Sequence, residues 1–132
     1  MKFIEPRNRK QLMLPQCLDD YVTADHPVRV IDTMVEEIYK SNKELFTSSN
    51  SQTDVGRPAY HKTLFVKLFL YGFINRIRSS RRLEQEAGRN YELIWLLGEL
   101  VPDHWTISNF RKENGELIEI ILKLVKEFLK KN

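Results

Sequence analysis

The stretch GRPAYHKTLFVKLFLYGFINRIRSSRRLEQEAGR, residues 56–89, decides the expected fold and carries most of the positive charge. Its first half predicts one helix from about His61 to Ile77, in which apolar residues occupy nearly every side. A helix that is apolar all round is covered by neighbours on most faces, so we expect it at the centre of the fold. Gly72 in its middle costs about 1 kcal/mol relative to alanine, and close approach of another helix is the expected reason.

The same stretch is strongly basic. From Arg57 to Arg89 there are eight Lys and Arg residues but only two Asp and Glu residues, a local charge of +6 against +3 for the whole chain. The remainder of the chain therefore carries −3. Positive charge gathered in one segment is typical of a domain that presents a basic face to a polyanion. Because an ordinary solvated face gives the same pattern, the charge alone leaves both interpretations open.

The second half of the stretch begins with a predicted helix that has cations, not acidic residues, in its first turn. Ser79 and Ser80 are good N-cap residues for a helix from Arg81 to Ala87 that closes at Gly88. The first turn of a helix favours acidic residues, yet arginines fill it here, and such conflicts often mark function. Backbone N–H groups, serine hydroxyls and guanidinium groups together predict a phosphate site. The predicted residues are Arg76, Arg78, Ser79, Ser80, Arg81 and Arg82, with Arg57 and Arg89 at the two ends of the basic segment.

Composition bounds the class of protein. The chain has 132 residues, 42% apolar and 30% charged, which is typical of one soluble globular domain. A single cysteine, Cys17, excludes an internal disulfide framework and favours a reduced, cytoplasmic setting. The longest apolar run, residues 64–74, contains Lys67 and is shorter than the roughly 20 residues of a membrane span. The N-terminus lacks the apolar region of a secretory signal, so no membrane partner is expected.

Capping residues and apolar spacing predict further helices on both sides of the central one. We expect an all-α domain over residues 1–132 with about six helices and a helix-turn-helix-like C-terminal half. Residues 1–24 are expected to form an irregular arm and residues 41–55 a loop. The other expected helices run from Pro27 to about Lys40 with Asp25 as N-cap, from Asn90 with Leu93, Leu96, Leu97 and Leu100 facing inward, from a Thr106 cap over Ile107 to Glu113, and from Glu116 to Lys131.

The short helix over residues 107–113 has a polar face. It carries Ser108, Asn109, Arg111 and Lys112, the mixture of hydrogen-bonding and cationic side chains that a helix in the DNA major groove uses. A solvated face on a short connector gives the same composition, and both interpretations stay open.

Two further features bear on partners and chemistry. The last helix is more apolar than a terminal helix needs, so it is expected to pack on the core or on a partner. The three histidines, His26, His61 and His104, are scattered and suggest no metal motif, and no cofactor is expected. Asp19 and Asp20 form a carboxylate pair of the kind that metal-assisted phosphoryl chemistry uses, but adjacent residues usually point apart and more often act in a turn or cap.

These residues resemble, in order, the N-terminal domain of bacterial insertion-sequence transposases. The resemblance covers most of the chain and leaves out the loop from Ser41 to Asp54. The segments that carry it are LDDYV (18–22), DHPVRVID (25–32), GRPAY (56–60), KLFLYG (67–72), RSSRRLE (78–84), RN (89–90), WL (95–96), PDH (102–104), TI (106–107), FRK (110–112) and Asn114.

The resemblance implies a helical domain that binds the terminal inverted repeats of the element as double-stranded DNA. In that family a following RNase H-like domain carries an Asp-Asp-Glu triad that binds two metal ions and cuts and joins DNA. No acidic residue here matches a triad position, and the chain ends at Asn132, about where that domain would begin. We therefore expect DNA binding for transposition without catalysis, from an excised domain or a natural remnant.

Two other functions compete with that interpretation. The first is a protein-interaction module: a truncated transposase that forms a homodimer through its last helix and inhibits the full-length enzyme. The same helix is also a candidate contact for a missing C-terminal catalytic domain. The second is a minimal nuclease that uses Asp19 and Asp20. Salt-dependent DNA binding by a monomer would favour the DNA-binding function, whereas a stable dimer without DNA affinity would favour the interaction module.

Overall fold

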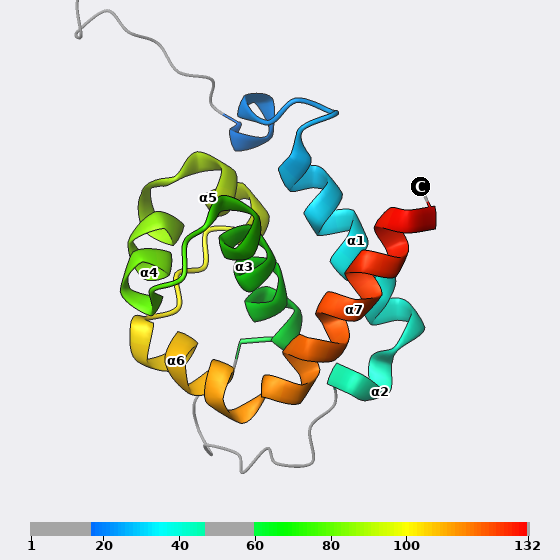
Figure 1. Ribbon diagram of the computed structural model, residues 1–132. Helices are drawn as coiled ribbons and strands as arrows, with labels where there is room; N and C mark the ends of the chain where they lie inside the picture. The colour runs from blue at the N-terminus through cyan, green and yellow to red at the C-terminus, as the bar shows by residue number, and fades with distance from the viewer. Residues whose placement is uncertain (1–16, 47–59, 132) are drawn as a thin grey trace, which may run out of the picture.

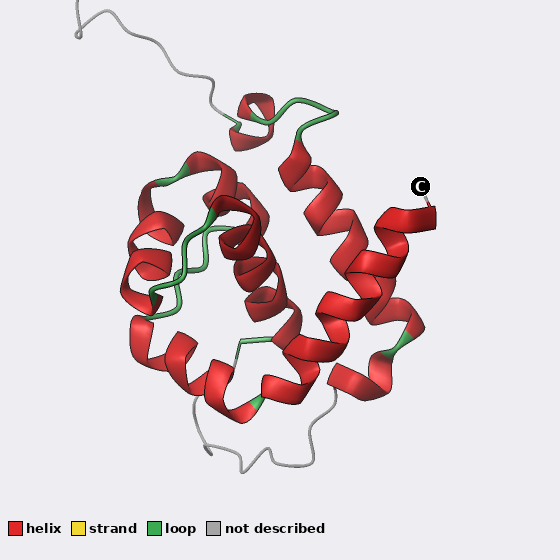
Figure 2. Ribbon diagram, in the orientation of Figure 1, coloured by secondary structure: helices red, strands yellow, loops and turns green. Residues whose placement is uncertain are grey.

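In the computed structural model, residues 17–46 and 60–131 are described, and within them the chain is helical with no β-strand (Figures 1 and 2). This confirms the predicted all-α class, with seven α-helices among those residues instead of about six. The elements are, in chain order, the 3-10 helix η2 (Leu18–Tyr21), α1 (Pro27–Ser41), α2 (Lys43–Phe46), α3 (Lys62–Asn75), α4 (Ser80–Arg89), α5 (Tyr91–Leu97), α6 (His104–Glu113) and α7 (Gly115–Lys131).

The apolar helix α3 lies at the centre, with α1 and α7 to one side of it and α4 and α6 to the other (Figure 1). It packs mainly against α1 and α5, and Leu68 near its midpoint is fully buried. The expected central position is therefore confirmed. Its last turn departs from the expectation, because Phe73 and Ile74 are 67% and 56% exposed.

One charge interrupts the apolar helix and ties it to α1. The Lys67 ammonium donates hydrogen bonds to Asp32 and Glu36 of α1, at N–O distances of 2.8 and 2.9 Å. Burial opposes the charge on Lys67, but the hydrogen bonds to the two carboxylates outweigh burial and raise its pKa. The charge of Lys67 is therefore paired with carboxylates inside the fold.

The chain reverses directly after α3, and Gly72 makes that reversal possible. The Ile77 N–H donates to the Gly72 carbonyl across 2.8 Å, and Arg76 between them adopts a left-handed conformation with φ 59°. A Cβ on Gly72 would lie 2.6 Å from the Ile77 carbonyl oxygen and 3.1 Å from Leu83 of α4. Close approach therefore explains the glycine, as predicted, although the nearest group is the turn and not another helix. The reversal also ends α3 at Asn75, before the predicted Ile77.

Two predicted N-caps were wrong, by one and by three residues. α1 is capped by His26 and not Asp25, because the His26 Nδ1 accepts the Val28 N–H. The other ring nitrogen of His26, Nε2, lies 3.0 Å from a Glu92 carboxylate oxygen of α5, which fixes the ring from the opposite side. α6 is capped by Asp103 and not Thr106, so it begins one turn earlier than predicted.

Other boundaries also differ. Gly88 lies inside α4, which continues to Arg89, and Asn90 both ends α4 and caps α5 through the Glu92 N–H. Gly98, in the left-handed region with φ 62°, ends α5 so early that Leu100 is 47% exposed instead of facing inward. α7 occupies the predicted residues, with Gly115 as its first.

The arm and the loop are partly helical. Within the expected arm, Leu18–Tyr21 forms η2 against α5, and Val22 is buried. Within the expected loop, Ser41 ends α1 and Lys43–Phe46 forms α2. The rest of both segments, residues 1–16 and 47–59, lies outside the described residues. In the half that is predicted to be helix-turn-helix-like, α4 packs against both α5 and α6.

Candidate nucleic-acid interface

The entrance of α4 is built as the sequence predicts. Ser79 caps the helix, and its hydroxyl accepts the Arg82 N–H at 3.3 Å. The first turn contains no acidic residue, and Arg81 and Arg82 are both exposed there. By helix geometry the N–H groups of Ser80 and Arg81 have no acceptor within the helix. Two cations and two N–H groups thus share the positive end of one helix.

Four exposed arginines, at this entrance and in the turn that leads to it from α3, are named here the four-arginine cluster: Arg76, Arg78, Arg81 and Arg82. None of the four forms an ion pair with an acidic side chain in the part of the chain that the structure describes. Other cations of the basic segment have partners: Lys67 binds two carboxylates, and the Lys62 ammonium donates to the Asn114 side chain at 3.0 Å. In the described part of the basic segment, the arginines without an acidic partner are therefore those of the cluster, since Arg89 pairs with Glu86.

Arg76 occupies a position where a glycine would be less strained. A side chain with φ near +60° costs roughly 1–2 kcal/mol relative to the right-handed region, which is why glycine usually ends a helix in this way. Arg76 sits there with φ 59° at the C-terminal end of α3, where the helix dipole favours a cation. The chain keeps a charge at this point at the expense of local strain, and observed strain of this kind supports a functional hypothesis.

Helix α6 presents a second polar surface beside this entrance. Because α6 begins at His104, the residues Trp105, Ser108, Asn109 and Lys112 are spaced along a single helical face. Asn109 and Lys112 are exposed, Ser108 is half-buried, and the indole of Trp105 is 68% exposed. The face predicted from the sequence is thus one turn longer and begins with an aromatic ring.

A pair of hydrogen bonds fixes α6 against α4. One carboxylate oxygen of Glu84 lies 2.9 Å from the His104 Nδ1 and 3.3 Å from the His104 backbone nitrogen. Both contacts join the first residue of α6 to the middle of α4, and the two helices pack against each other. The relative position of the two surfaces is therefore set by these contacts.

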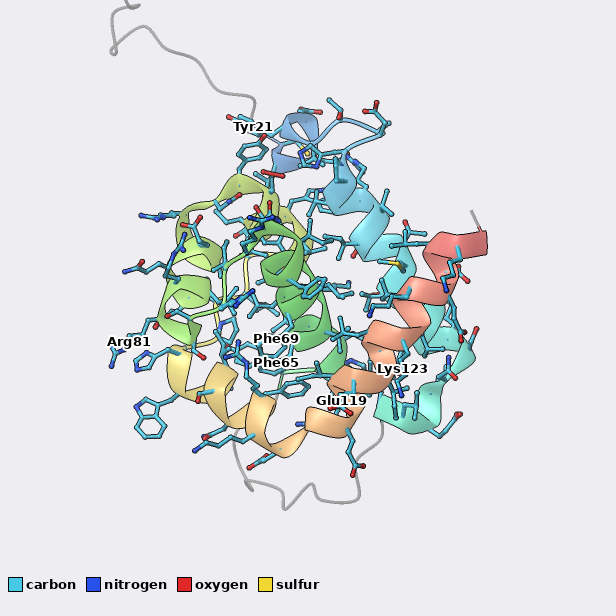
Figure 3. All side chains as sticks on the ribbon, viewed as in Figure 1. Tyr21, Phe65, Phe69, Arg81, Glu119 and Lys123 are labelled. Carbon is cyan, nitrogen blue, oxygen red and sulfur yellow. The ribbon has the colours of Figure 1, made fainter. Side chains whose placement is uncertain are left out.

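Between the two helices lies an open hollow of about 370 Å³, named here the α4–α6 hollow. It brings together residues from both predicted surfaces. Its lining is Ser79, Ser80 and Arg81 from the α4 entrance, and His104, Trp105 and Ser108 from α6. Figure 3 shows Arg81 projecting outward from α4, on the opposite side of the molecule from Lys123 of α7.

Two predicted residues, Arg111 and Arg89, are placed differently from the rest. The Arg111 guanidinium donates to the Arg78 carbonyl at 3.0 Å and lies 4.9 Å from the centre of the Phe69 ring, so it joins α6 to the turn before α4. Arg89 lies at the far end of α4 and pairs with Glu86, whose pKa the Arg89 hydrogen bond lowers. Arg57 lies outside the described residues.

Two residues of the hollow, His104 and Trp105, were missed by the sequence analysis. The missed signal was Asp103, a good N-cap residue followed three positions later by a threonine that can bond back to it. In the structure the Asp103 carboxylate accepts both the backbone N–H and the hydroxyl of Thr106, at 2.8 and 2.9 Å. These hydrogen bonds, that from the backbone N–H foremost, lower the pKa of Asp103.

We expect acid to weaken the start of α6 through Asp103. A carboxyl group whose pKa is lower in the folded state stabilises the fold above its unfolded-state pKa, and that stabilisation is lost as the pH falls below about 4. Asp103→Asn removes the titrating group. The thermal midpoint of this variant should therefore depend less on pH below about 4 than the midpoint of the wild type. A thermal-melt series from pH 2.5 to 7 measures the difference, and parallel curves would contradict the role of this cap.

Asp19, the first residue of the acidic pair, is hydrogen-bonded within the fold. One Asp19 oxygen accepts hydrogen bonds from Arg29 at 2.7 Å and from the Trp95 indole at 2.9 Å. The Trp95 and Arg29 hydrogen bonds lower the pKa of Asp19. Among the described residues no three His, Cys, Asp or Glu side chains are grouped so that they could hold a metal ion. In the same part of the chain, every helix is too short or too polar for a membrane span.

Comparison with known proteins identifies one related family. Residues 16–113 match the family model described as "Transposase domain (DUF772)", which covers well over half of the chain. No curated protein and no solved structure matches the chain significantly. The matched range includes the α4 entrance and the whole of α6, so both surfaces of the α4–α6 hollow belong to the matched region.

Proposed function

The chain belongs to this transposase-domain family, and from that premise we propose that it binds double-stranded DNA at the terminal inverted repeats of its element. The observation that carries the proposal is the four-arginine cluster, which has no ion-pair partner among the described residues and stands beside the polar face of α6. Phosphates attract such a cluster without regard to sequence, whereas side chains on a helix face read base edges.

The two surfaces have different roles in this proposal. The cluster and the Ser80 and Arg81 N–H groups anchor the DNA backbone, because charge-assisted hydrogen bonds to phosphate are strong and carry no sequence information. Asn109 and Lys112, both exposed on α6, contact bases. Ser108 is half-buried in the hollow and lies between the two surfaces.

We further propose that this chain recognises DNA without cutting it. Two-metal strand cleavage requires several carboxylates that converge on the metal ions. Asp19, the best candidate, instead bonds Arg29 and Trp95, which join it to α1 and α5. The Asp19 carboxylate therefore has a structural role, because it holds η2 against α1 and α5.

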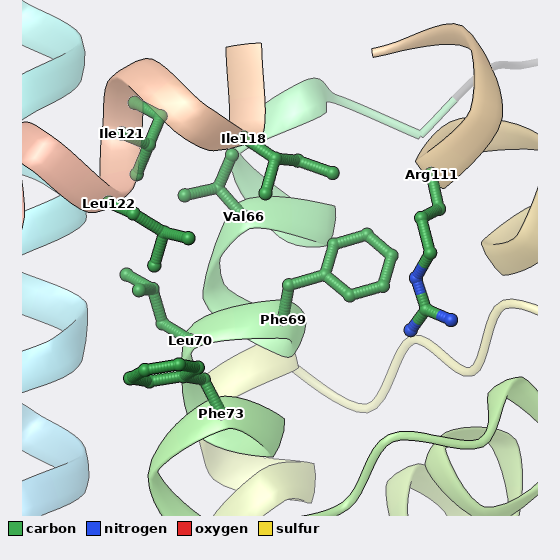
Figure 4. A pocket seen from close by; sticks show the side chains of 8 residues that line it. All are labelled: Val66, Phe69, Leu70, Phe73, Arg111, Ile118, Ile121 and Leu122. Atoms are coloured by element: carbon green, nitrogen blue, oxygen red, sulfur yellow. The ribbon is translucent and has the colours of Figure 1, made fainter. Parts of the chain in front are cut away.

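A second candidate function is self-association through α7. An apolar groove lies between α3 and α7, and its lining includes the exposed Phe73 together with Ile118 and Leu122 (Figure 4). The two halves of α7 carry opposite charge: residues 116–122 contain two acidic residues and no cation, whereas residues 123–131 contain four lysines and one glutamate. A second copy that packs antiparallel would match acidic to basic halves, which suits a two-fold symmetric dimer.

Titration of the purified chain with two DNA duplexes tests the proposed function. One duplex carries the inverted repeat and the other the same bases in scrambled order, each measured by fluorescence anisotropy at several salt concentrations. Binding should weaken steeply with salt on both. Asn109→Ala should spare the scrambled duplex and cost roughly 1–3 kcal/mol on the repeat.

Lys123→Ala is the matched control, since Lys123 lies on α7 far from Arg81 (Figure 3). It should leave both affinities unchanged. A chain that sediments as a stable dimer and binds neither duplex would overturn DNA binding and favour self-association.

A further inference from the structure

The Trp105 side chain is exposed in a place where nothing in the described structure explains it. At 68% it is the most exposed of the large hydrophobic side chains among the described residues, whereas the other tryptophan, Trp95, is half-buried against the core and bonded to Asp19. An indole has a large flat surface, and burying that surface against a partner contributes strongly to binding. It also has an N–H group at its edge that can donate a hydrogen bond. Its position at the start of the α6 face makes a partner on that face the simplest explanation.

The surroundings of Trp105 indicate the chemistry of that partner. The α4–α6 hollow offers hydroxyl groups of Ser79, Ser80 and Ser108 and the imidazole of His104, together with the cationic Arg81. An apolar protein side chain would fit the groove between α3 and α7 better, because that groove is lined almost entirely by apolar residues. A flat ring with a hydrogen-bonding edge and a nearby negative charge matches the hollow, and a nucleotide has all three features.

We infer that Trp105 stacks on an unpaired base of the bound DNA, while the four-arginine cluster holds the flanking phosphates. The inference rests on the proposed function and adds to it a preference for DNA in which a base is unstacked. A base within an intact duplex has both faces covered by its neighbours, so an indole can stack fully only on a base that has left the stack. Stacking on aromatic side chains tolerates any base, and the hydroxyl groups of the hollow would bond its edge.

Three duplexes of one sequence test the inference. The first is fully paired, the second contains a single bulged 2-aminopurine, and the third carries an abasic residue at the bulge. The wild type should bind the bulged base roughly 5- to 150-fold more tightly than the abasic bulge, the range expected for one stacked base. Binding should also quench the 2-aminopurine fluorescence.

Trp105→Ala should remove both the preference and the quenching, whereas Trp105→Phe should retain most of each. Arg81→Ala should weaken binding to all three duplexes by the same factor. Circular dichroism of each variant checks that the fold is intact, as expected for an exposed position. If Trp105→Ala keeps the preference, or lowers affinity equally for all three duplexes, the stacking role is wrong while DNA binding stands. If the wild type binds none of them, the proposed function fails as well.

Discussion

Gly72→Ala is expected to lower the free energy of unfolding by about 1–3 kcal/mol, the usual range for forcing an extra methyl group into a packed site. The added Cβ would lie 2.6 Å from the Ile77 carbonyl oxygen, a backbone atom of the turn, and 3.1 Å from Leu83. Alanine also favours a helix over glycine by about 1 kcal/mol, but relief of the clash requires the turn itself to move. Urea unfolding followed by circular dichroism measures the change.

Gly88→Ala is the control with the opposite expected sign. Gly88 lies inside α4, and a Cβ there would meet nothing within 4 Å. The same substitution should therefore raise the unfolding free energy by about 0.4–1 kcal/mol, through helix propensity and a less flexible unfolded chain. If both substitutions stabilise the protein, the turn can shift at little cost. Close approach of the turn would then not be the reason for a glycine at position 72.

This turn links the fold to the candidate site. The reversal at Gly72 places Arg76 and Arg78 directly between α3 and α4 and brings Ser79 to the entrance of α4. A shifted turn would move the cluster as well, so we expect Gly72→Ala to weaken DNA binding in addition to stability. Gly88→Ala should leave DNA binding unchanged.

The sequence alone predicted the helical class, the central helix and the basic segment because each depends on local composition. Apolar residues on every side of α3 can be counted without knowledge of its neighbours, and so can the cations between Arg57 and Arg89. Helix starts were less predictable, since several capping residues stand close together in the chain. At α6, Asp103 is the cap and not Thr106, and the His104 backbone N–H that follows it donates to Glu84, twenty residues earlier, a contact that no local pattern contains.

The availability of each cation could not be predicted, because it depends on contacts between distant residues. Lys67 faces two carboxylates of α1, and Arg111 reaches the Arg78 carbonyl thirty-three residues away. Arg89 pairs with Glu86 one turn earlier in the same helix, a spacing that the sequence does show. Trp105 was missed for a related reason: a helix predicted to start at Ile107 excludes it from the α6 face.

Replacing Arg81 and Arg82 together by alanine should weaken binding to repeat and scrambled duplexes alike. Charge-assisted hydrogen bonds are worth roughly 1.5–3 kcal/mol each, so removing one such bond to a phosphate should lower affinity about tenfold or more. The slope of log K against log salt should flatten by about 0.9 for each phosphate that the variant no longer neutralises. Stability should not fall, because both cations oppose the positive end of α4, and their removal should raise it by a few tenths of a kcal/mol. Lower DNA affinity with equal or greater stability would separate a binding role from a structural one.

Arg89→Ala provides the matched control within the same helix. Arg89 lies at the C-terminal end of α4, where a cation suits the helix dipole and pairs with Glu86. Its loss should cost a little stability and leave the salt slope unchanged, which is the reverse of the result expected for the pair at the entrance. A flattening as large as that of one entrance arginine would mean that DNA runs along the whole of α4. If removal of Arg81 and Arg82 leaves the slope untouched, the four-arginine cluster is not the phosphate anchor, and the proposed orientation of DNA on this domain is wrong.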